Sequence, residues 1–111
     1  MPVTFDVDAL KSELELDHED IVELIGEFRT FLIESMEGLD AAISAKDFTK
    51  ARSIAHSIKG SSGNLRVGQV FEITKAMQFK VDEGKEEELA NMLPELKKEA
   101  QAFLTESENF S

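Results

Sequence analysis

The sequence predicts an all-α fold: an antiparallel up-down four-helix bundle with a short extra helix at its N-terminal end. Apolar residues recur every three or four positions through most of the 111-residue chain, and strand-like alternation is absent. The connections between these periodic segments are short, as they are between antiparallel helices. A chain of this length predicts one domain over residues 1–111, with no room for a second.

The first two predicted helices cover residues 4–14 and 18–45. The first is short and weakly amphipathic, and we expect it to lie across the end of the bundle. The second begins at a strong capping signal, in which Asp17 is the N-cap and Asp20 occupies the third helical position. Its apolar residues then follow the spacing of one helix face: Ile21, Leu24, Ile25, Phe28, Phe31, Leu32, Met36, Leu39, Ala42 and Ile43.

The remaining predicted helices cover residues 48–64, 68–82 and 86–108. Asp47 caps the first of these, and Gly84 is the expected C-cap of the second. Pro94 lacks a backbone donor, and we expect it to kink or split the last helix.

The helix over residues 48–64 has two different faces. At about 100° per residue, one side gathers the apolar residues Ala51, Ile54, Ile58 and Leu65, flanked by Ser61 and Ser62. His56 points the opposite way. Its own stripe holds neighbours three, four and seven positions away: Arg52, Ser53, Lys59, Gly60 and Gly63.

This stripe is a candidate site for phosphoryl chemistry at His56. A neutral imidazole is nucleophilic at nitrogen near pH 7, and Lys59 would neutralise the charge of an accepted phosphoryl group. Gly60 and Gly63 each cost about 1 kcal/mol in a helix interior relative to alanine, and their expected use is to let another molecule approach closely. The alternative is an ordinary surface histidine with a lysine nearby by chance.

Charge is distributed unevenly along the chain. Net charge is −11, which argues against nucleic acid and anionic membranes as partners. Residues 48–81 nevertheless carry six basic side chains and one acidic one, whereas both flanking segments are acidic. This basic segment predicts a partner with an acidic site. Alternatively, its bases form ion pairs within the chain.

Residues 55–65, with the sequence AHSIKGSSGNL, resemble the signature of histidine-containing phosphotransfer (HPt) domains. The four-helix layout of that family would cover nearly all of the chain. One departure is Arg66, where the family often has glycine, and this concerns the end of the helix more than the chemistry.

The resemblance implies that the partner is a response-regulator receiver domain or a sensor histidine kinase. His56 would accept a phosphoryl group from a receiver aspartate and pass it to another receiver, with Lys59 stabilising the transferred charge. In such domains a polar residue about twenty-two positions after the histidine often bonds the other ring nitrogen, and Gln78 has this spacing. Lys75 lies on the same helix edge, and Arg52 would be a docking contact. A solvated Gln78 is the alternative.

Other functional classes find less support. No ATP-binding glycine loop is present, so we expect a phosphoryl carrier without an ATP site, and not an enzyme in its own right. No cofactor or metal is expected on this chain, and Mg²⁺ would belong to the receiver; His18 among carboxylates is typical of a solvated surface. Two alternatives remain open: an adaptor that is never phosphorylated, and the phosphoacceptor domain of a chemotaxis-type kinase.

The chain has no cysteine, no leader-like N-terminus and no run of about 20 apolar residues. These features predict a soluble, cytoplasmic protein without a membrane segment, and we expect a monomer.

Overall fold

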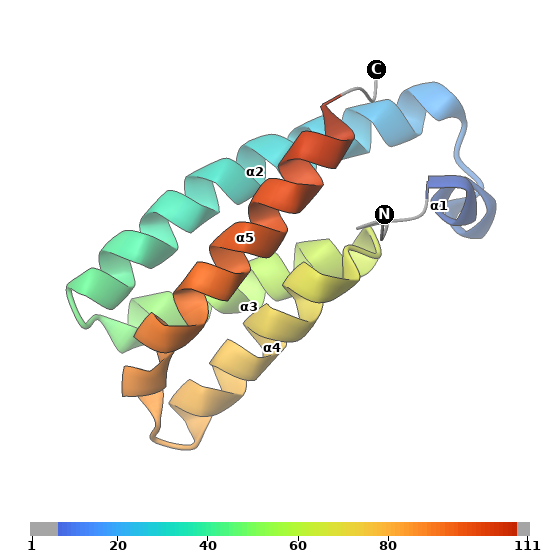
Figure 1. Ribbon diagram of the computed structural model, residues 1–111. Coiled ribbons are helices and arrows are strands. Elements are labelled where there is room, and N and C mark those ends of the chain that lie inside the picture. The colour runs from blue at the N-terminus through green and yellow to red at the C-terminus, as the bar shows by residue number, and fades with distance from the viewer. Residues whose placement is uncertain (1–6, 109–111) are drawn as a thin grey trace.

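The computed structural model describes residues 7–108, and every regular element in that range is helical. Figure 1 shows the elements in chain order: α1 (Val7–Leu14), α2 (His18–Ser44), α3 (Phe48–Asn64), α4 (Gly68–Asp82), the 3₁₀ helix η1 (Glu86–Glu88) and α5 (Leu89–Ser107). The all-α class predicted from the sequence is confirmed. Residues 4–6, which the first predicted helix included, lie outside the described range.

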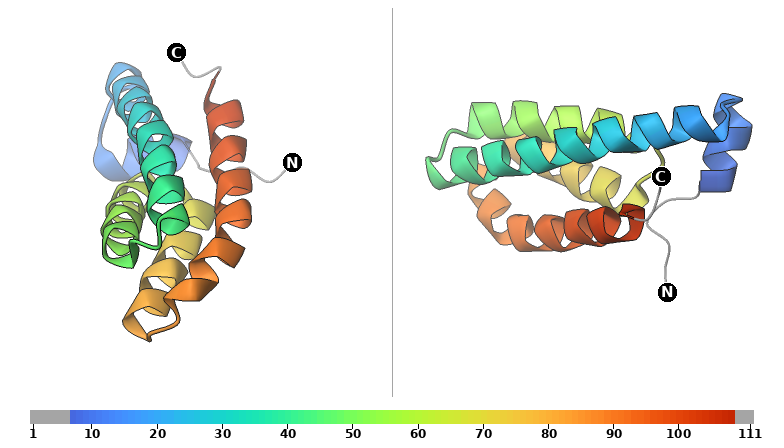
Figure 2. Two further views of the ribbon diagram at one scale, coloured as in Figure 1. Left: turned by 90° about the vertical axis from the view of Figure 1, so that its left-hand side faces the viewer. Right: turned by 90° about the horizontal axis from the view of Figure 1, so that it is seen from above.

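Helices α2 to α5 pack around a shared core. Contacts join α2 to α3, α3 to α4, α4 to α5 and α5 back to α2, and the two views of Figure 2 show this closed arrangement. The molecule measures 42 × 25 × 22 Å. Its long dimension is set by α2, since 27 helical residues extend about 40 Å. Helix α1 lies across one end (Figure 2, right), with Leu10 fully buried.

Side-chain caps explain where α2 and α3 begin. The Asp17 carboxylate accepts a hydrogen bond from the backbone N–H of Asp20 at 3.0 Å, and Asp47 accepts one from Lys50 at 3.2 Å. Each bond satisfies an amide that has no partner within its own helix. Both caps were predicted from the sequence.

Helices α2, α3 and α4 are each followed by a residue in the left-handed backbone conformation. Gly84 follows α4 with φ 75°, and the equivalent positions after α2 and α3 are Lys46 with φ 58° and Arg66 with φ 59°. At each end two backbone hydrogen bonds turn the chain back on the last helical turn, which is the Schellman arrangement. Arg66 therefore occupies a position that suits glycine, and α3 still ends at Asn64 as predicted.

Two details of the helices differ from the sequence interpretation. Pro94 lies inside α5, which continues unbroken to Ser107, so the prediction of a split there is wrong. The irregularity comes earlier, as η1, and α5 begins only at Leu89. Pro94 lies in the second turn of α5 on its exposed side, and its missing N–H removes one backbone hydrogen bond without ending the helix.

The inner face of α3 is narrower than predicted. Ile58 and Leu65 are buried, but Ile54 is only partly buried and packs toward α2, while Ala55 is fully buried. Small residues at the centre of this face let α3 approach its neighbours closely. The buried hydroxyls of Ser62, Thr74 and Ser107 all donate to backbone carbonyls of the preceding helical turn.

Candidate functional site

His56 lies on the exposed side of α3, and its ring meets a side chain from α4. The imidazole Nδ1 is 3.4 Å from the amide oxygen Oε1 of Gln78. An amide oxygen only accepts, so this contact is a hydrogen bond only in the tautomer that has its proton on Nδ1 and its lone pair on Nε2. The contact therefore favours the tautomer whose outer nitrogen is nucleophilic.

Arg52, one helical turn before His56, is held by an acidic side chain of α4. Its Nε and Nη2 donate to the two carboxylate oxygens of Asp82 at 2.6 and 3.1 Å. Hydrogen bonding to Asp82 raises the pKa of Arg52, and hydrogen bonding to Arg52 lowers the pKa of Asp82. The docking role expected of Arg52 stays a prediction, and in the structure its guanidinium pairs with Asp82.

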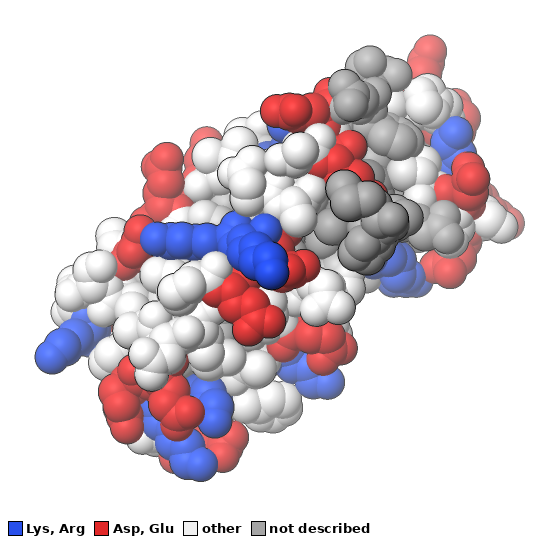
Figure 3. Space-filling view, viewed as in Figure 1, with Lys and Arg blue, Asp and Glu red and all other residues white. Residues whose placement is uncertain are grey.

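The basic segment is partly neutralised by such pairs. Arg66 contacts Glu13 of α1 at 2.7 Å, and Lys80 contacts Glu88 at 3.3 Å. Figure 3 shows a similar mixture on the face over α5, where basic side chains lie next to acidic ones. The alternative that these bases pair within the chain therefore holds for three of the six: Arg52, Arg66 and Lys80.

Lys59 and Lys75 differ from these three. Lys59 is half-buried one turn after His56, and within residues 7–108 it has no acidic partner within 4.0 Å. The ammonium of Lys75 lies 5.9 Å from the centre of the Phe71 ring, a cation–π distance. Among the basic residues that have no carboxylate partner in the described range, Lys59 thus lies nearest to His56 in the sequence.

The two glycines of the stripe have different surroundings. A Cβ added at Gly60 would meet nothing within 4 Å, so this position is open to another molecule. A Cβ added at Gly63 would lie 3.0 Å from Cδ1 of Phe71, which is tighter than ordinary van der Waals contact, so the ring would have to shift slightly. Gly63 therefore lets α4 pack against α3, a role that the sequence interpretation did not predict.

Comparison with known protein families decides what kind of domain this is. A family model described as "Hpt domain" matches residues 23–106, which is more than half of the chain. The chain belongs to the Hpt domain family. Comparisons with curated proteins and with solved structures gave no match.

The matched region of this Hpt domain runs from α2 to the last turns of α5 and contains both His56 and Gln78. Helix α1 lies outside it. The residues of the His56 stripe therefore all belong to the part of the chain that carries the family resemblance.

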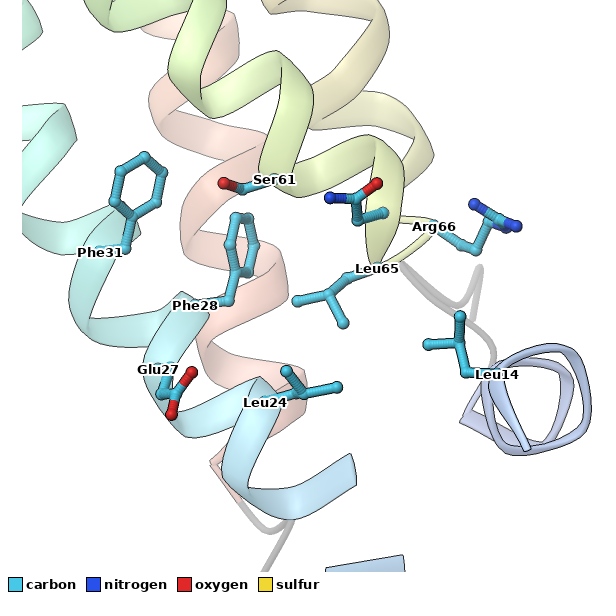
Figure 4. Close-up of a pocket in the computed structure, with 9 residues that line it drawn as sticks. Leu14, Leu24, Glu27, Phe28, Phe31, Ser61, Leu65 and Arg66 are labelled. Atoms are coloured by element: carbon cyan, nitrogen blue, oxygen red, sulfur yellow. The ribbon is translucent and has the colours of Figure 1, made fainter. Parts of the chain in front are cut away.

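A hollow of about 420 Å³ lies where α1, α2 and α3 meet. Figure 4 shows apolar side chains from all three helices turned toward it, among them Leu14, Leu24, Phe28 and Leu65. Ser61 and Asn64 form its α3 wall. Asn64 lies only about 80° around the helix from His56, so the hollow adjoins the exposed stripe. The sequence interpretation treated Ser61 only as a small packing residue.

Two residues of the site were missed from the sequence, Asp82 and Phe71. Both face the His56 stripe from α4, and a signal for them was present. Arg52 lies four residues before His56, and Asp82 lies four residues after Gln78. Gly63 lies seven residues after His56, and Phe71 lies seven residues before Gln78. Equal steps in opposite directions are what two antiparallel helices bring together.

Over residues 7–108, no group of three or more potential ligands gathers in an arrangement that would hold a metal ion. Nor does any helix of that range combine the length and the apolar character that crossing a bilayer requires.

Proposed function

We propose that this Hpt domain accepts a phosphoryl group on Nε2 of His56 from the phospho-aspartate of a receiver domain and delivers it to a second receiver. The observation that carries the proposal is the contact between Nδ1 of His56 and Oε1 of Gln78 at 3.4 Å on an exposed ring. This contact favours a lone pair on the outward nitrogen, where a partner protein can reach it.

The proposed step balances without an added proton. Nε2 attacks phosphorus, the N–P bond forms, and the P–O bond to the receiver carboxylate breaks, which releases a carboxylate. Nδ1 keeps its proton, so the ring becomes an imidazolium. Oε1 of Gln78 then accepts a charge-assisted hydrogen bond from a cationic ring, which is stronger than the bond to the neutral ring.

Charge develops on the phosphoryl oxygens during this transfer. Lys59 would neutralise this charge, and the lack of a carboxylate paired with it in the described range supports this role. Mg²⁺ would be supplied by the receiver. The open surface at Gly60 would let the receiver loops approach the ring.

Family membership supports the wider setting. Hpt domains are phosphoryl carriers of phosphorelays without an ATP site of their own. We accordingly propose receiver domains as donor and acceptor, with a sensor histidine kinase upstream.

The test is incubation with a phosphorylated receiver, followed by gel separation. We expect acid-labile, base-stable label on the wild-type domain and none on His56→Gln. His18→Gln is a matched control, because His18 is the second of the two histidines and should leave labelling intact. Label that survives His56→Gln, or no label from any receiver of the source organism, would contradict the proposal. Labelling by an ATP-bound kinase domain with no receiver present would instead support the chemotaxis-type alternative.

A further inference from the structure

Helix α4 contacts the His56 stripe at three successive levels. Arg52 pairs with Asp82, His56 contacts Gln78, and Gly63 packs on Phe71. Along α3 the contact positions rise from 52 to 56 to 63. Along α4 their partners fall by the same steps, from 82 to 78 to 71. The three contacts therefore belong to one antiparallel register, with the imidazole contact in the middle.

The middle contact is long for a hydrogen bond. Its 3.4 Å separation is longer than the usual 2.7–3.2 Å of a hydrogen bond to nitrogen. His56 is exposed and Gln78 is half-buried, so water competes for both groups. The orientation of Gln78 toward Nδ1 therefore depends on how firmly α4 is held beside α3.

The Arg52 and Asp82 pair is suited to hold it. Both carboxylate oxygens are engaged, which fixes orientation as well as distance. Asp82 is also the last residue of α4, and Gln78 lies one turn inside that end. Fixing Asp82 thus keeps the turn that carries Gln78 in place.

We propose, building on the proposed function, that Arg52 and Asp82 are positioning residues that hold Gln78 against His56 and so set the tautomer of the imidazole. They do not touch the transferred group. Arg52 acts through Asp82 and α4, and its effect on phosphotransfer passes through Gln78.

The decisive readout is the ratio of the Nδ1–H to the Nε2–H tautomer of His56. It is measured on ring-¹⁵N-labelled protein by long-range ¹H–¹⁵N NMR near pH 8, with no partner present. Exposed ion pairs contribute a coupling worth about a 1.4- to fivefold change in an equilibrium. We expect Asp82→Asn to lower the Nδ1–H to Nε2–H ratio by about that factor, and to slow transfer from a phospho-receiver similarly.

Three further variants separate positioning from general destabilisation. The charge-reversed pair Arg52→Asp with Asp82→Arg should restore the ratio. Asp40→Asn is the matched control, since it removes a pair of similar exposure with Lys97, at 3.0 Å, between α2 and α5. It should leave the ratio unchanged. In a Gln78→Met background, Asp82→Asn should have no further effect on the ratio.

An unchanged ratio in Asp82→Asn, or an equal fall in Asp40→Asn, would overturn the inference. The tautomer measurement needs no phosphate, so it stands even if His56 is never phosphorylated. Conversely, normal labelling of His56 with an unaltered ratio in Asp82→Asn would leave the proposed function intact and remove only the positioning role.

Discussion

Replacing Gly60 by alanine should make this domain more stable and a poorer phosphotransfer partner. Gly60 lies inside α3, one turn after His56, and an added Cβ would meet nothing within 4 Å. The substitution therefore brings no clash within the domain. Its effects on folding and on docking should have opposite signs.

The stability gain follows from helix propensity. Alanine in a helix interior is favoured over glycine by about 0.5–1 kcal/mol, because an alanine residue loses less backbone conformational entropy on folding than a glycine residue does. For a chain of 111 residues this corresponds to a rise in Tm of about 2–5 °C. Urea unfolding followed by circular dichroism would measure the free energy of unfolding.

The loss of transfer follows from close approach. A methyl group inserted into a packed contact costs about 1–3 kcal/mol, and this corresponds to about a 5- to 150-fold slower transfer if the cost falls on the transition state. The assay is the rate at which label moves from a phosphorylated receiver to the domain, under conditions where the domain is limiting.

Gly26→Ala is the matched control for this prediction. A Cβ at Gly26 would also meet nothing within 4 Å, and the residue lies inside α2 on the far side from Leu24 and Phe31, which face the hollow beside α3. It should raise stability as much as Gly60→Ala and leave transfer unchanged. Wild-type transfer in Gly60→Ala, or slowed transfer in Gly26→Ala, would refute the reasoning.

Three further predictions concern other parts of the structure. Lys46→Gly should raise the free energy of unfolding by about 1 kcal/mol, because φ is 58° there, while Gly84→Ala at φ 75° should lower it by about as much; urea unfolding checks both. Gln78→Met removes the acceptor for Nδ1 and should slow transfer to His56 about two- to tenfold without loss of helicity, so an unchanged rate would contradict the tautomer argument. The lowered pKa of Asp82 means that its ion pair stabilises the fold fully at neutral pH, and that this contribution disappears as pH falls through the carboxyl pKa in the folded state, below about 4. Asp82→Asn should therefore flatten the acid limb of the stability curve, and carboxyl NMR titration should place the pKa of Asp82 below that of an exposed aspartate.

The helices could be predicted from the sequence because their signals are local. Apolar spacing and the caps at Asp17 and Asp47 involve residues within one or two turns of each other, so a linear reading finds them. The predicted split at Pro94 was wrong, because α5 continues through Pro94 to Ser107 and the irregular turn, η1, precedes the helix. The left-handed residue Arg66 could not be foreseen, since nothing in its local sequence favours that conformation.

The candidate site also has some features that the sequence predicted and others that only the structure showed. The exposed position of His56, with Lys59 and Gly60 on its stripe, follows from the 3.6-residue period of a single helix and was available from the sequence alone. The resemblance to HPt domains also implied a role for Gln78, twenty-two positions after His56. The ion pair of Arg52 with Asp82, and the contact of Gly63 with Phe71, were decided only when α3 and α4 came together in one register. These contacts join residues that lie thirty and eight positions apart, and their spacing in the sequence becomes informative only once the register of α3 against α4 is known.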